Sequence, residues 1–119
     1  MQTEELRDVV LQTLDDMKAK DVVVLDVRGK TGITDIMIIA SGTSDRHVKS
    51  IAQSLAFKAK QAGEMPLGTE GMDDGEWALV DLNGVVVHVM QPKVRDFYHL
   101  ERLWSMEEPP AAERKLESV

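Results

Sequence analysis

With 119 residues and no cysteine, the chain has the size of one domain with its own core, and disulfides and thiolate metal sites are excluded. The chain has 14 Lys and Arg against 21 Asp and Glu, which gives a formal net charge of −7, and it has no Lys/Arg run. This charge favours docking on a basic protein over direct, sequence-specific binding to nucleic acid. The acidic start is unlike a signal peptide and no apolar run approaches the ~20 residues of a membrane span, so we expect a cytoplasmic protein with no membrane partner.

The first part of the chain predicts a helix followed by two strands. Apolar residues recur at helical spacing between Glu4 and Lys20, and Thr3 is the expected N-cap. The run VVVLDV at 22–27 is continuous and β-branched, as in a strand that is buried on both faces. A second apolar run at 33–41 predicts another strand, beyond a glycine-containing turn.

A second helix is predicted in the middle of the chain. It should extend from Asp45 to Ala62, because Ser44 is a good N-cap and Gly63 is a typical residue just past a helix end. The stretch 64–75 has three glycines and one proline, which predicts a loop or a short, irregular edge strand.

A β-hairpin follows, because Asn83-Gly84 separates the apolar runs 77–82 and 85–90 and favours a two-residue type I′ turn. Such a turn fixes the register, and side chains then alternate between two faces. One face is wholly apolar and must be core: Ala78, Val80, Leu82, Val85, Val87 and Val89. The other face mixes apolar and polar groups: Trp77, Leu79, Asp81, Val86, His88 and Met90. This second composition is typical of a protein interface, and spacing alone leaves open whether a helix covers it.

Pro92 suits the first turn of a third helix that should run to about Trp104. Residues 105–119 contain a Pro-Pro pair and few large apolar side chains, which predicts a disordered acidic tail. The element order α-β-β-α-(β)-β-β-α predicts an α/β fold of the α+β type, with a mixed sheet and packed helices in one domain over residues 1–104.

The residue types that carry out catalysis do not form a recognisable site. The turn Ser41–Arg46 precedes a helix, where a phosphate could bind, but it lacks the Walker pattern. Asp26, Asp35 and Asp81 are scattered singly, without the spacing that directs two carboxylates at one metal ion. His88 is more simply explained as a half-buried imidazole than as a general base. We therefore expect a protein that is not an enzyme, with no catalytic, cofactor or metal site; a nucleotidyl or phosphoryl transferase that uses the turn is the rival hypothesis.

Four stretches of the chain together resemble one known family. They are DVVVLDVRGKTGITDIMIIASGTSDRHVKSIA, PLGTEG, GEWALVDLNGVVVHVMQP and VRDFYHLERLW. In this order and spacing they are similar to the iojap-type ribosomal silencing factors, and the likeness covers about residues 3–104.

The resemblance implies properties that composition and spacing do not show. Family members bind the large ribosomal subunit through a basic protein, the universal fourteenth protein of that subunit, and block joining of the small subunit when nutrients are scarce. Their fold is similar to that of nucleotidyltransferases without the paired metal-binding carboxylates, and some members form homodimers. The partner-facing positions of the family correspond here to Glu70, Gly71, Trp77, Leu79, Asp81, His88 and Tyr98.

The leading expectation is a translational repressor that acts by steric blocking. In it, Trp77 and Leu79 are apolar anchors for the ribosomal protein, whereas Glu70 and Asp81 steer its basic surface. The second rival is a homo-oligomerising scaffold in which the same hairpin face meets its own copy across a two-fold axis.

Overall fold

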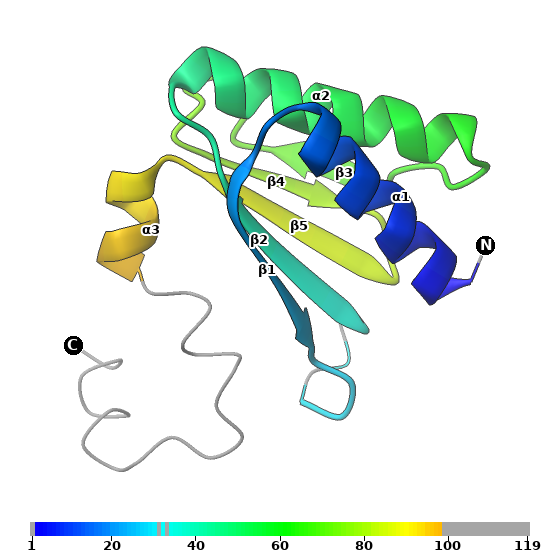
Figure 1. Ribbon diagram of the computed structural model, residues 1–119. Coiled ribbons are helices and arrows are strands. Elements are labelled where there is room, and N and C mark those ends of the chain that lie inside the picture. Colours follow the sequence, from blue (N-terminus) through cyan, green and yellow to red (C-terminus); the bar gives the residue numbers. More distant parts are fainter. Residues whose placement is uncertain (1, 31, 33, 99–119) are drawn as a thin grey trace, which may run out of the picture.

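The computed structural model describes residues 2–30, 32 and 34–98, and over these the chain forms a five-stranded sheet with helices packed against it (Figure 1). The element order is the predicted one, which confirms the fold class. The elements are α1 (Thr3–Asp16), β1 (Lys20–Asp26), β2 (Ile36–Ser41), α2 (Asp45–Gln61), β3 (Gly68–Glu70), β4 (Trp77–Asp81), β5 (Val85–Met90) and α3 (Pro92–Tyr98).

The sheet is mixed, with strand order β1-β2-β5-β4-β3. Its centre is a parallel pair, β2 and β5, and the other neighbours are antiparallel. Every residue of β2 and β5 is buried, which explains why these strands read as continuous apolar runs instead of alternating ones. The hairpin has the predicted register, with Trp77 opposite Met90 and Asp81 opposite Val86.

The turn of the hairpin differs from the prediction. Asn83 has a positive φ of 74°, but Gly84 does not, whereas a type I′ turn needs positive φ at both positions. The cause lies in tertiary contacts of Gly84. Its carbonyl oxygen accepts a hydrogen bond from the Ile36 N–H at 3.1 Å, and a Cβ at this position would lie 2.9 Å from the Thr3 hydroxyl. The turn conformation is therefore set by contacts with α1 and β2.

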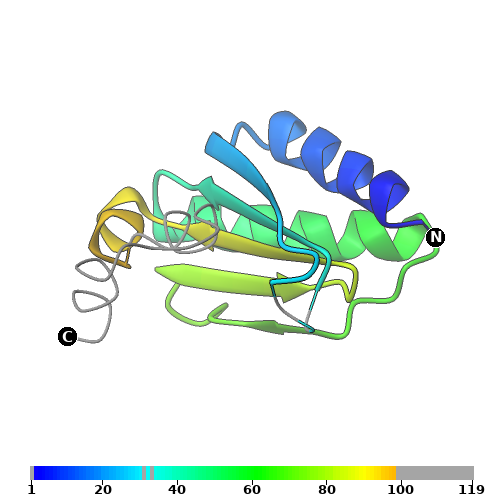
Figure 2. The same cartoon turned by 90° about the horizontal axis from the view of Figure 1, so that it is seen from below.

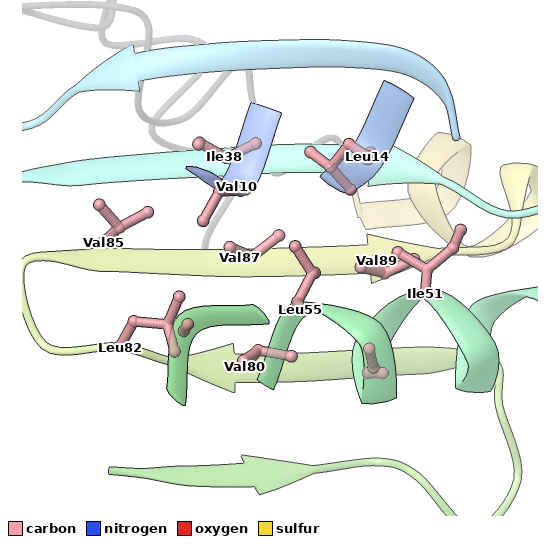
Figure 3. Packing of buried hydrophobic residues seen from close by; sticks show 14 of the residues in the cluster. Val10, Leu14, Ile38, Ile51, Leu55, Val80, Leu82, Val85, Val87 and Val89 are labelled. Carbon is pink, nitrogen blue, oxygen red and sulfur yellow. The ribbon is translucent and has the colours of Figure 1, made fainter. Parts of the chain in front are cut away.

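The main core lies between the sheet and the two long helices (Figure 3). The predicted apolar face of the hairpin is confirmed as part of this core, because all six of its residues are 0% exposed. From the helices, the core receives Leu6, Val10 and Leu14 of α1 and Val48, Ile51, Ala52, Leu55 and Ala59 of α2. Fully burying one such leucine contributes about 1.5–3 kcal/mol, so this layer supplies most of the hydrophobic stabilisation.

α1 ends at Asp16, earlier than predicted. Lys18 takes the left-handed conformation, with φ of 59°, and its N–H donates to the Asp15 carbonyl at 3.0 Å. The Ala19 N–H donates to the Leu14 carbonyl at 2.9 Å, which completes a Schellman ending. The N-cap prediction is also wrong, because the cap is Gln2 and Thr3 is the first helical residue.

α2 begins at Asp45 as predicted and ends at Gln61, one residue before the predicted end. Ser44 is the N-cap, and its hydroxyl oxygen accepts a hydrogen bond from the His47 N–H at 3.1 Å. Beyond the last helical residue, Gly63 has φ of 100° and its N–H donates to the Lys60 carbonyl at 3.1 Å. Only a residue without a Cβ adopts this conformation without strain, so the glycine determines where the helix ends.

α3 lies at one end of the opposite face of the sheet, where Val94 packs against a second buried cluster that includes Ile39 and Met90 (Figure 1). Arg95 anchors it, because its buried guanidinium donates to the Ser41 hydroxyl oxygen at 3.0 Å and to the Asp21 carbonyl at 2.5 Å. The rest of the predicted third helix, up to Trp104, and the predicted tail 105–119 lie outside the described residues. In the part that the structure describes, no helix combines the length and apolar character needed to span a membrane.

Candidate partner-binding surface

The sheet face opposite α1 and α2, named the second face below, collects most of the predicted partner-binding residues. Figure 2 views the sheet from below, with β4 and β5 in front of α2. The strand registers place side chains in rows across this face. From β1 to β3, one row consists of Val23, Ile39, His88, Leu79 and Glu70. The next row consists of Leu25, Met37, Val86, Asp81 and Gly68. Five of the predicted residues thus share one face, since Trp77 lies beside the first row.

The structure answers the question of what covers the second face. Among the described elements, α3 is the one that lies on it, at the end where Trp77 and Met90 pair. Toward β3 the face opens: Leu79 and Asp81 are half-buried and Glu70 is exposed. Tyr98 is the last residue of α3, so its backbone is placed at the end of the element that borders this face.

Trp77 and His88 form the polar contact at the centre of the second face. The indole Nε1–H donates a hydrogen bond of 2.9 Å to Nδ1 of the imidazole, and the ring centroids lie 5.8 Å apart. Because Nδ1 accepts this bond, the proton of the neutral imidazole is on Nε2. The pair therefore fixes both the orientation and the tautomer of His88.

His88 is buried, with 7% of its surface exposed, and is not half-buried as the sequence suggested. Burial lowers the pKa of the imidazole from 6.5 to about 4, so the ring is neutral near pH 7. Its unprotonated nitrogen, Nδ1, already accepts the hydrogen bond from Trp77, which argues against a role as a general base. The Nε2–H donates to no described residue, so it is available to an acceptor on a partner.

Gly71 has a conformational role next to this surface. Its φ is 75°, and a Cβ built on it would lie 1.9 Å from the carbonyl oxygen of Trp77. Only glycine permits this close approach of two backbone segments. Gly71 thereby sets how Glu70 at the end of β3 lies relative to Trp77 at the start of β4.

Negative charge gathers where β3 connects to β4. The exposed acids of this connection are Glu70, Asp73, Asp74 and Glu76. Glu76 forms an exposed ion pair with Lys93 at 3.7 Å, which is worth little in water. On the second face itself, the Asp81 carboxylate accepts a hydrogen bond of 2.9 Å from the Asn83 N–H. The β3 side of the second face therefore carries negative charge, which attracts a cationic surface.

The small-residue turn before α2 uses its backbone donors within the protein. The Thr43 N–H donates to Nδ1 of His47 at 2.9 Å, the His47 N–H to Ser44, and the Arg46 N–H to the Asp45 carboxylate at 2.8 Å. A phosphate at this turn would have to displace these bonds and approach the Asp45 charge. The rival transferase hypothesis gains no support from this geometry.

The three scattered acids have separate partners. Asp26 accepts from the Arg28 N–H at 3.0 Å, and Asp35 accepts from the Thr3 hydroxyl at 3.2 Å, whereas Asp81 serves the hairpin turn. Within residues 2–30, 32 and 34–98, no three His, Asp or Glu side chains gather in a way that could hold a metal ion. Each of the three acids therefore has a structural hydrogen-bond partner of its own.

Comparison with known proteins places the chain in a family. The model of the family described as "Ribosomal silencing factor during starvation" matches residues 1–118. The chain belongs to the ribosomal silencing factor family. A relative named Ribosomal silencing factor RsfS, from Chromobacterium violaceum, is 44% identical over 112 residues, which are 94% of this chain and 92% of the relative.

Two further comparisons extend this likeness, one of them to structure. A crystal structure of a protein from Chromobacterium violaceum has a TM-score of 0.87 at 44% identity and covers 92% of each chain, which supports the mixed fold. A mouse relative named Mitochondrial assembly of ribosomal large subunit protein 1 is 33% identical over 83% of this chain and 45% of the mouse protein.

Proposed function

We propose that this protein is a translational repressor that binds the large ribosomal subunit through a basic ribosomal protein and blocks joining of the small subunit, which lowers protein synthesis when nutrients are scarce. Membership of the silencing factor family supports the role at the ribosome, and the name of the mouse relative supports the large subunit. The observation that carries the proposal is the part of the second face toward β3, where Trp77, Leu79 and Asp81 are half-buried and Glu70 is exposed.

The second face would bind its partner without chemistry. Trp77 and Leu79 would be the apolar anchors, while Glu70 and Asp81 would meet basic side chains. The Nε2–H of His88 would donate to a backbone carbonyl of the partner. By family resemblance, the partner would be the universal fourteenth protein of the large subunit, with Gly71 and Tyr98 also facing it. A Kd near 1 nM needs a binding free energy of about −12 kcal/mol, which a surface with two or three strong anchors can supply.

Sedimentation with isolated large subunits tests the proposal. Truncating an aromatic anchor typically costs at least ~2 kcal/mol, so Trp77→Ala should weaken binding about thirtyfold. Glu70→Lys should weaken it as well, because it reverses the charge at the open end. Leu67→Ala and Asp15→Lys are the matched controls, since Leu67 is 65% exposed and neither residue is on the second face.

The proposal fails if both variants sediment with large subunits as the wild type does while circular dichroism shows native structure. A reassociation assay with small subunits then tests the blocking step separately. Pairing of two copies through the second face is a competing state, and light scattering would reveal it as a mass that falls in Trp77→Ala.

A further inference from the structure

The outward side of α2 gathers positive charge that does not form a run in the sequence. At spacings of three and four residues along the helix lie Arg46, Lys49, Gln53, Phe57 and Lys60. Residues so spaced share one side of a helix. This side is opposite the stripe that packs on the sheet, which includes Val48, Ile51, Leu55 and Ala59. We refer to it as the α2 stripe.

The α2 stripe is available for binding. Arg46 and Lys60 are exposed, Lys49 is half-buried, and Phe57 is 58% exposed. None of the ion pairs found among residues 2–30, 32 and 34–98 involves a cation of the stripe. A protein with a formal net charge of −7 therefore carries one helix with unpaired positive charge and an exposed aromatic ring at its centre.

We propose that the α2 stripe binds the phosphate backbone of an RNA strand, with Phe57 stacking on a base. At 1.5 Å per residue the stripe extends over about 20 Å, which is long enough for several phosphates. An aromatic ring between cations suits RNA better than an acidic peptide, because every base offers a flat face for stacking. That the RNA belongs to the ribosome rests on the proposed function.

The position of the stripe permits both contacts at once. α2 lies on one side of the sheet and the second face on the other, so an RNA strand on α2 would not compete with the protein partner (Figure 2). The acidic loop between β3 and β4 comes close to the start of α2, since a Cβ on Gly75 would lie 2.6 Å from the Asp45 carbonyl oxygen. The end of the stripe near Lys60 is therefore the more favourable for phosphate.

Salt dependence of binding to large subunits tests this inference. Each phosphate contact contributes about 0.7–0.9 to the slope of log K against log salt, so Lys49→Glu/Lys60→Glu should lower the slope by about 1.5. The double variant Lys18→Glu/Lys20→Glu is the control, because it changes net charge equally outside α2. If both double variants change the slope alike, the stripe is not a contact.

A photo-crosslinking arm identifies what lies on the stripe. Azidophenylalanine replaces Phe57, and the complex with large subunits is irradiated and then digested with ribonuclease. A ribonuclease-sensitive adduct is the expected result, whereas an adduct with a ribosomal protein overturns RNA as the occupant. In the sedimentation assay Phe57→Ala should weaken binding by about fivefold to about 150-fold, the range for loss of one stacked base.

Failure of this inference can be told apart from failure of the proposed function. With a fluorescent single-stranded RNA oligonucleotide, Trp77→Ala should bind as the wild type does, and Lys49→Glu/Lys60→Glu should bind more weakly. If the wild type binds neither large subunits nor this RNA, both proposals fail; if it binds subunits but not RNA and shows no RNA adduct, only the stripe proposal fails.

Discussion

The buried imidazole of His88 makes the stability of the fold depend on pH in a defined direction. In the native state burial holds its pKa at about 4, whereas an unfolded chain has the ordinary value near 6.5. The unfolded state therefore takes up a proton first as the pH falls, and acid favours unfolding. The stabilisation is fully present above pH 6.5 and is lost as the pH falls from 6.5 toward 4.

The magnitude follows from the shift. A full difference of about 2.5 units corresponds to roughly 3 kcal/mol, and between pH 7 and pH 5 the loss of unfolding free energy from this group is about 2 kcal/mol. His88→Asn removes the titration while it keeps an oxygen near the position of Nδ1 that can accept from Trp77. The variant should therefore lose about 2 kcal/mol less than the wild type over this interval.

Urea denaturation followed by far-ultraviolet circular dichroism at pH 7 and pH 5 measures the difference. The carboxylates and the other two histidines are the same in both proteins, so their contributions cancel when the two pH dependences are subtracted. Equal losses of unfolding free energy in wild type and variant would refute the idea that a buried, neutral His88 is responsible.

Two further predictions concern backbone geometry. Gly71→Ala should lower the unfolding free energy by about 2 kcal/mol or more, because the residue has positive φ and a Cβ would meet the Trp77 carbonyl oxygen. Gly68→Ala should change the unfolding free energy little, because a Cβ at Gly68 would have no atom within 4 Å. Equal effects of the two substitutions in urea denaturation would contradict the contact at Gly71. Ser44→Ala should lower the unfolding free energy by about 1 kcal/mol, because it removes the hydroxyl that caps α2. Ser50→Ala, inside the same helix, is the control and should change the unfolding free energy little. If the two variants are equally stable, the Ser44 hydroxyl contributes nothing.

Much of the fold could be predicted from local signals. Asn83-Gly84 determined the hairpin register, and Ser44 and Gly63 determined the ends of α2, because each acts through its immediate neighbours. The end of α1 was missed because Lys18 occupies a left-handed position where a sequence signal would be glycine. The turn type was missed because Gly84 responds to contacts from distant parts of the chain.

The candidate site, like the fold, could be predicted only in part. The register made Trp77 and His88 diagonal neighbours on one face, so their hydrogen bond was within reach of the sequence. What no local pattern showed was the parallel pairing of β2 with β5, which brings Ile39 beside His88 and extends the face toward β1. The buried Arg95, which anchors α3, likewise depends on atoms of Asp21 and Ser41.

The α2 stripe was visible in the helical spacing, but a search for consecutive Lys and Arg does not find it.

The parallel pair at the centre of the sheet also has a consequence for synthesis of the protein. It joins residues 36–41 to residues 85–90, so β2 cannot acquire its central neighbour until almost all of the described chain has been made. Contacts so distant in sequence slow folding, because a long loop must close before they form. A nascent chain that stops before residue 85 lacks the strand that carries His88, and thus has no second face. We therefore expect folding, and with it any ability to bind a ribosome, to be a late and cooperative event that follows release of the chain's C-terminal half from the ribosome that makes it.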